Sequence, residues 1–124
     1  MGKRVLMVGW HPTATAIDYT KWPDLTPEKL LAMLNADKDK IAATGHDITL
    51  AFIHTAESAA GDVQSILEQD DFDIVMIGAG VRRVDDHFLV FERLVNVVHE
   101  HAPKARIAFN TRPEDSAEAI ERWV

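Results

Sequence analysis

The sequence predicts one three-layer α/β domain over residues 1–124, in which helices flank a doubly wound sheet of four parallel strands. Three observations indicate this class. The length suits a single domain, four short runs are almost entirely apolar, and a helical pattern follows each run. Cysteine is absent, which excludes disulfide bridges, zinc–cysteine sites and thiol catalysis.

The four apolar runs are the predicted strands. Their apolar character is nearly continuous rather than alternating, which is typical of strands that are covered on both faces. Branched side chains, which favour strands, are abundant in them. The runs occupy residues 5–8, 48–53, 74–77 and 107–109.

A helix is predicted after each strand. In the first helix, Thr26 is the N-cap and Pro27 takes the first helical position, where its missing N–H costs nothing. We expect Asp85 and Asp86 to cap the third helix, and Pro103 to end it. The helices cover about residues 27–43, 56–69 and 86–102, and a fourth begins near 113.

Right-handed crossovers between these strands give a doubly wound sheet. We expect the strand order 2-1-3-4, as in the flavodoxin-like arrangement. In such a sheet, ligands bind beyond the carboxyl ends of the strands where the order reverses, here between the first and third strands. We therefore expect the site among residues that follow strands. These are Trp10, His11, His54, Gly78, Gly80, Arg82, Arg83, His87, Asn110 and Arg112.

The segment after the third strand indicates an anion site. Gly78 and Gly80 would let backbone amides approach a ligand, and Arg82 and Arg83 follow directly. The dinucleotide fingerprint lacks its third glycine, and no P-loop is present. The alternative interpretation is a tight turn that needs small residues and carries two solvated arginines.

Histidines provide the candidate catalytic groups. His11 and His54 end neighbouring strands, so their side chains could approach each other, and His87 could join them. Imidazoles titrate near neutral pH and also bind metals. No carboxylate lies at a short fixed spacing from these histidines, which counts against both roles. His11 and His54 are the candidate catalytic residues, and we predict no metal site.

The connection from Trp10 to Leu25 has sixteen residues, whereas loops between a strand and a helix usually have about 2–6. It contains Trp10, Tyr19 and Trp22. The loop is therefore expected to be a lid, a binding wall or an interface arm. An ordered loop packed on its own aromatic side chains is the alternative.

The third predicted helix is apolar around most of its circumference. Eight of the eleven residues from Phe88 to Val98 are apolar, and one stripe against the sheet would need only about half of them. We expect a second copy of the chain to cover the remainder, which gives a homodimer through this helix.

The charge distribution limits the partners. The chain has 20 acidic and 13 basic side chains, a net charge of −7, which argues against nucleic-acid binding. Between Ile41 and Val81 there are seven acids and no Lys or Arg, so the acidic excess lies away from the arginines that follow the strands. The apolar runs are too short for a signal peptide or a membrane span, so we expect a cytoplasmic protein with no membrane partner.

Three families share this architecture, but the chain lacks the site motif of each. Response-regulator receivers carry a phosphoacceptor aspartate after the third strand, where this chain has Gly78. Flavodoxins join the first strand directly to a helix through a hydroxyl-rich phosphate loop, whereas here the helix begins well after residues 12–15. Cobalamin-binding domains use Asp-x-His-x-x-Gly, and only His11 matches that motif.

Residues 77–82, 91–99 and 109–111 resemble a group of small uncharacterised bacterial proteins, and the likeness covers most of the chain. The resemblance implies one flavodoxin-like domain and no assigned activity.

The leading functional prediction is a protein that binds a small anionic or nucleotide-like ligand at the carboxyl edge of the sheet. The sequence identifies no cofactor. Two alternatives remain open. One is a hydrolase or isomerase with His11 or His54 as general base and Arg82 binding the charge of the substrate. The other is an interaction module that docks through the helix from Phe88 to Val98 and has no small-molecule site.

Overall fold

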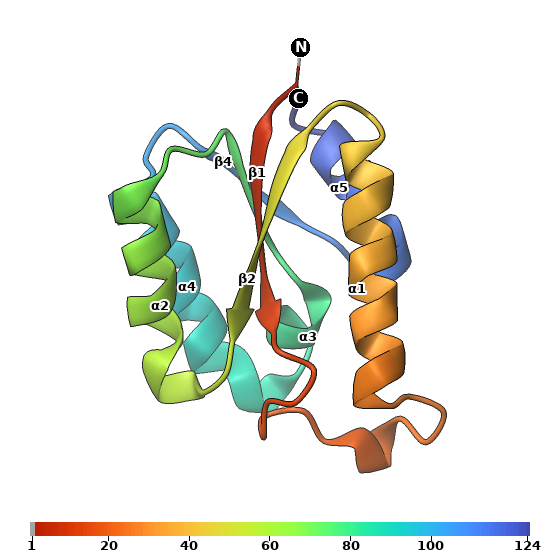
Figure 1. Cartoon of the computed structure of the whole chain (residues 1–124). Helices are drawn as coiled ribbons and strands as arrows, with labels where there is room; N and C mark the ends of the chain where they lie inside the picture. The colour runs from red at the N-terminus through yellow and green to blue at the C-terminus, as the bar shows by residue number, and fades with distance from the viewer. Residues whose placement is uncertain (1) are drawn as a thin grey trace.

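Four parallel strands in the order β2-β1-β3-β4 form the sheet of this protein, as the computed structural model shows (Figure 1). The structure describes residues 2–124. The predicted fold class and strand order are confirmed, with the order reversing between β1 and β3. The strands are β1 (Arg4–Trp10), β2 (Asp47–Ile53), β3 (Ile74–Ile77) and β4 (Arg106–Phe109).

The helices follow the predicted pattern with two differences. A short helix, α3, occupies the position of the expected glycine turn, and the helix after it begins with a separate 3-10 turn. The α-helices are α1 (Pro27–Ala42), α2 (Ala56–Gln69), α3 (Ala79–Arg82), α4 (Phe88–His101) and α5 (Ser116–Glu121). The 3-10 turns are η1 (Tyr19–Lys21), η2 (Asp85–His87) and η3 (Pro113–Asp115).

The predicted capping of the third long helix by Asp85 and Asp86 is wrong. The N-cap of α4 is His87, and no side-chain hydrogen bond caps the helix there. The two aspartates lie in η2 instead, because the tighter 3-10 turn takes up the first residues of the expected helix.

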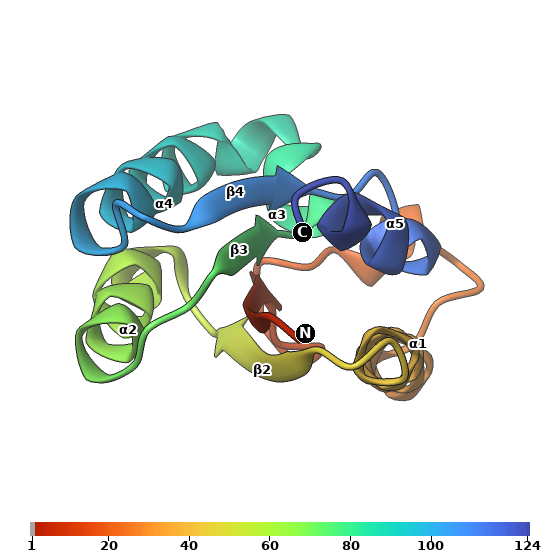
Figure 2. The same cartoon turned by 90° about the horizontal axis from the view of Figure 1, so that it is seen from above.

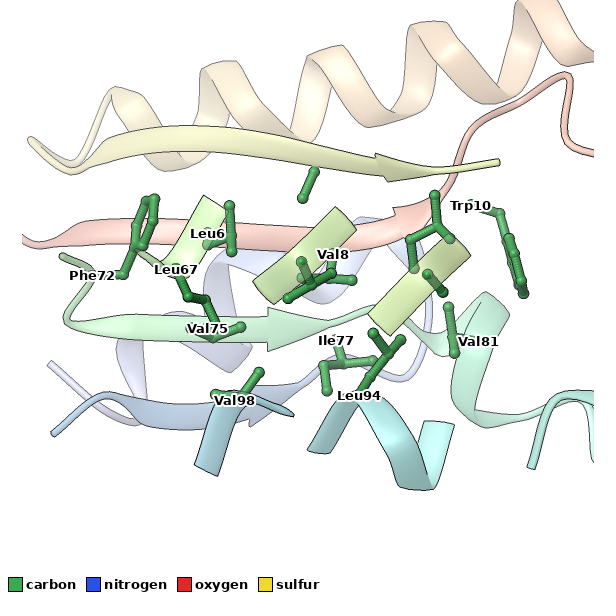
Figure 3. Packing of buried hydrophobic residues seen from close by; sticks show 14 of the residues in the cluster. Leu6, Val8, Trp10, Leu67, Phe72, Val75, Ile77, Val81, Leu94 and Val98 are labelled. Carbon is green, nitrogen blue, oxygen red and sulfur yellow. The ribbon is translucent and has the colours of Figure 1, made fainter. Parts of the chain in front are cut away.

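Helices cover both faces of the sheet. Figure 2 shows α2 and α4 on one face and α1 and α5 on the other. Side chains alternate along β1, so Leu6 and Val8 pack in the cluster under α2 and α4, whereas Val5 and Met7 pack on the opposite face. Figure 3 shows the first of these clusters, in which Leu94 and Val98 from α4 are fully buried.

The two ends of α1 differ in packing. Near its C-terminal end, Asp37 and Ile41 are buried, and they are the only buried residues of this helix. Nearer the N-terminal end, Leu30, Met33 and Leu34 are only half-buried. The helix is therefore anchored at one end, and space is left between its other end and the sheet.

None of the helices in the described residues 2–124 is long and apolar enough to cross a membrane.

Candidate functional site

A pocket of about 940 Å³ opens at the carboxyl edge of the sheet. It lies between α1, the ends of the strands and the loops that follow β1, β3 and β4. This is the edge at which the order of strands reverses, as the sequence predicts. The volume lies in the range of roughly 300–1,000 Å³ that is common for small-molecule sites.

Most of the pocket wall is apolar. The sheet contributes side chains from the face that α1 covers incompletely, and α1 contributes the half-buried residues of its N-terminal half. Soft, unbranched methionines are common here and can adapt to ligands of different shape. The apolar wall residues from the sheet and α1 are Met7, Leu50, Phe52, Met76, Leu30, Met33 and Leu34.

The long loop after β1 forms another wall of the pocket. Ile17, Trp22 and Leu25 from this loop line it. The loop is held by hydrogen bonds within itself, including one from the Tyr19 hydroxyl to the Pro12 carbonyl. This placement agrees with a binding wall, although Trp22 is also 57% exposed to solvent.

Asn110 lies at the polar end of the pocket and is buried. Its Oδ1 accepts a hydrogen bond from the Ala79 amide at 2.7 Å, and its Nδ2 donates to Ser116 Oγ at 2.9 Å. The predicted ligand-binding residue therefore lines the pocket, while its carboxamide links α3 to α5. In this structure the Asn110 side chain joins the segments that form the rim of the pocket.

Arg82, Arg83 and Arg112 lie at the carboxyl edge, as predicted, but each already has a hydrogen-bond or ion-pair partner there. Arg82 donates from Nη2 to the Asn110 carbonyl at 2.7 Å, and it does not line the pocket. Arg83 donates to the Thr111 carbonyl at 3.0 Å, and Arg112 pairs with Glu114 at 3.6 Å. Arg83 and Arg112 line the pocket and are exposed.

Charges at the pocket are balanced rather than positive. Three basic side chains line it, and so do four carboxylates. The pocket therefore has no excess of positive charge to attract an anion over a distance. The basic residues are Lys21, Arg83 and Arg112, and the acidic ones are Asp18, Asp24, Asp86 and Glu114.

The glycine segment brings β3 close to β1. The Gly78 amide donates to the Val8 carbonyl at 2.8 Å, and a Cβ on Gly78 would lie 3.3 Å from that same oxygen. A Cβ on Gly80 would meet only Trp10, at 3.9 Å, so nothing crowds that position. With the Gly78 and Ala79 amides already bonded, fewer backbone donors remain for a ligand than the sequence suggests.

His11 and His54 approach each other as predicted. Their rings stack with centroids 4.7 Å apart and an interplanar angle of 24°. The Nδ1 atom of His11 accepts the Thr13 amide at 3.1 Å, so the neutral ring carries its proton on Nε2. Neither histidine lines the pocket, and catalysis by them stays a prediction.

His87 is placed differently from the other two histidines. It lines the pocket and packs on Trp10, with ring centroids 4.9 Å apart. Trp10 also lines the pocket, is 4% exposed, and its indole Nε1 has no hydrogen-bond partner among the described residues. Within residues 2–124, no group of three or more His, Asp or Glu side chains is arranged to hold a metal ion.

Asp37 is the polar residue that the sequence reasoning missed. It is 7% exposed, and its Oδ2 lies 3.4 Å from Ser116 Oγ. Burial raises the pKa of the Asp37 carboxyl to about 6, and the hydrogen bond from Ser116 opposes this shift. A signal was present, because Asp37 falls on the same helical stripe as Leu30, Leu34 and Ile41, where an apolar residue is expected.

Comparisons with known proteins add no family to this description. No model of a known protein family matches the chain, and a search of curated proteins finds no significant relative. The resemblance to small bacterial proteins therefore stays a prediction.

Proposed function

We propose that the protein binds a small organic molecule in the pocket at the carboxyl edge, with an apolar body between α1 and the sheet and an anionic or other polar end at the rim. The observation that carries this proposal is the pocket itself, about 940 Å³ in volume and walled mainly by apolar side chains. Binding to an apolar wall is most favourable when an apolar group of the ligand displaces water from it.

The polar end of the ligand is expected to lie near Asn110. Arg83 and Arg112 line this part of the site and could pair with a phosphate or carboxylate group. Because carboxylates line the pocket as well, an anion alone would gain little there. A nucleotide-like ligand fits the proposal when its base takes the apolar part of the pocket.

Ligands with an apolar body should raise the melting temperature of the protein, whereas inorganic phosphate should not. A ligand at ten times its Kd adds about 1.4 kcal/mol of stability, or about 5 °C for a domain of this size. Decanoate, adenosine monophosphate and the fluorescent sulfonate anilinonaphthalene sulfonate are suitable probes in a thermal-shift assay. The proposal is contradicted when no probe with an apolar body produces a shift.

Filling the pocket should abolish the shift. Leu34→Trp places an indole in the pocket wall, whereas Leu31→Trp makes the same change on α1 at an exposed residue that does not line the pocket. Decanoate should stabilise the Leu31→Trp variant as it does the wild type, and should leave Leu34→Trp unchanged. Equal shifts in the two variants would place the binding site elsewhere.

A second candidate function, self-association through α4, is favoured by exposed apolar side chains. Phe88 is 57% exposed and Leu89 is 71% exposed, both in the first turn of α4. Leu94 and Val98, in contrast, are buried against the sheet. We propose that a second copy of the chain covers the exposed part of this helix, as the apolar pattern of the sequence indicates.

Leu89→Lys should convert a dimer to a monomer, because a lysine charge at the centre of an apolar contact loses hydration without gaining a partner. Leu31→Lys is the matched control, since Leu31 is also exposed but lies on α1. Sedimentation velocity at micromolar concentration distinguishes the two states. A monomeric wild type would rule out the dimer.

A further inference from the structure

A buried chain of hydrogen bonds connects α1 to the rim of the pocket. It runs from Asp37 to Ser116 Oγ at 3.4 Å, from Ser116 Oγ to Asn110 Nδ2 at 2.9 Å, and from Asn110 Oδ1 to the Ala79 amide at 2.7 Å. Ser116 and Asn110 both line the pocket. The chain therefore links α1, by way of α5 and the segment after β4, to α3, with the Asp37 carboxyl at one end.

An ionised Asp37 would be poorly compensated. Its one hydrogen bond within the described residues comes from the Ser116 hydroxyl, and the distance is long at 3.4 Å. The same hydroxyl lies closer to the Pro113 carbonyl, at 2.9 Å, and that carbonyl already accepts the Ser116 backbone N–H. A neutral Asp37 needs no such compensation, because it brings no charge into its buried position.

The charged groups around Asp37 favour the neutral form. Burial is the largest influence on the pKa of Asp37 and raises it. Glu114 and Asp115 of η3 raise it too, because a second negative charge nearby is unfavourable, whereas the Ser116 hydrogen bond and Lys40 on α1 lower it. The net result is a pKa of about 6. The carboxyl thus changes its charge within a pH range in which the protein can be studied in solution.

We propose that Asp37 is a proton-controlled positioning residue, which holds α1 against residues 110–116 when it is neutral and loosens this contact when it is charged. Leu34, on the pocket wall, lies one turn before Asp37 on the same helix. A movement of α1 at Asp37 therefore shifts both the pocket wall at Leu34 and the contact of α1 with the rim at Ser116. The predicted effect on ligands depends on the function proposed above, whereas the proton-controlled contact does not.

An NMR titration tests the contact without any ligand. The carboxyl ¹³C resonance of Asp37 should titrate near pH 6 in the wild type, and the side-chain amide resonances of Asn110 should follow with the same midpoint. In Asp37→Asn, which keeps the shape and a donor but has no charge to lose, the Asn110 resonances should no longer titrate at that midpoint. Ser116→Ala should leave the Asp37 titration in place and uncouple Asn110 from it.

With a purely structural Asp37, the Asn110 resonances would not follow the Asp37 titration. Asp37 titrating near pH 4, or Asn110 following the same curve in Asp37→Asn, would overturn the proposal. The first of these measurements uses the wild type only, so it decides the matter even when a variant folds poorly.

Anilinonaphthalene sulfonate tests the effect on the pocket, because its sulfonate keeps its charge over this pH range. Binding to the wild type should be about fivefold weaker at pH 7.5 than at pH 5, a typical size for coupling between two sites. The change should be less than about twofold in Asp37→Asn, in which the pocket histidine His87 is still present. Equal pH dependence in both proteins would overturn regulation of the pocket by Asp37.

The two experiments fail separately. Absence of sulfonate binding at both pH values would contradict the proposed function, and with it the effect on ligands, while an intact NMR titration would still support the proton-controlled contact. A missing titration alongside normal sulfonate binding would overturn the role of Asp37 and leave the binding function supported.

Discussion

Replacing Asn110 by alanine should lower the free energy of unfolding by about 3 kcal/mol, because the change leaves a backbone donor in the site without its partner. The Ala79 amide would lose its acceptor at 2.7 Å, and Ser116 would lose its donor at 2.9 Å. For a domain of this length the melting temperature should fall by about 10 °C. Denaturant unfolding followed by circular dichroism measures both quantities.

Asn96→Ala is the matched control for this variant. Asn96 is exposed on α4, and its only side-chain hydrogen bond in the described structure is to the Glu92 carbonyl in the preceding turn of the same helix. Alanine has the higher helix propensity, so the control should change stability by less than about 0.5 kcal/mol. A similarly small effect at Asn110 would show that its buried hydrogen bonds contribute little net stability.

Raising the pH from 4.5 to 8 should cost the wild type about 2 kcal/mol of stability through Asp37. The pKa of this carboxyl is raised in the folded protein from 3.8 to about 6, so the folded state holds the proton more tightly than the unfolded chain. Its contribution is complete below pH 3.8 and is lost as the pH rises through 6. Above that range the folded protein retains a buried charge.

The informative quantity is the difference in stability between the wild type and Asp37→Asn, because all other titratable side chains are the same in the two proteins. Asp37→Asn should become more stable relative to the wild type by about 2 kcal/mol between pH 4.5 and 8. Urea unfolding at a series of pH values measures this difference. Parallel stability curves for the two proteins would contradict a raised pKa at Asp37.

The fold was predictable because its signals are local and repeated. Continuous apolar runs such as Ile74–Ile77 are typical of strands covered on both faces, and Thr26 and Pro27 mark a helix start that the structure confirms. Once strands and helices alternate, chirality leaves few topologies, and likeness to the flavodoxin-like arrangement selected the order 2-1-3-4 among them. The prediction that Asp85 and Asp86 cap the helix was wrong because a 3-10 turn occupies Asp85–His87 and α4 begins after it.

The location of the pocket was also predictable, but its apolar walls were not. The sequence placed Asn110, Arg83 and His87 at the carboxyl edge, and all three line the pocket. It indicated an anion site because it could not show that Arg82 donates to the Asn110 carbonyl or that the Gly78 amide bonds to Val8. Those contacts join residues far apart in the chain.

The sequence by itself determined the α/β class and the parallel sheet, because hydrophobic periodicity and the chirality of crossovers act on every segment in the same way. The strand order came from the likeness of this pattern to the flavodoxin-like arrangement, and that order gives the edge at which the pocket opens. Only the tertiary structure decided that a pocket with apolar walls lies beneath α1 and that Asp37 lies in a buried network next to it. The physical reason is that pocket shape and hydrogen-bond pairing depend on how separate elements pack. The space left along one half of α1 is a property of that packing.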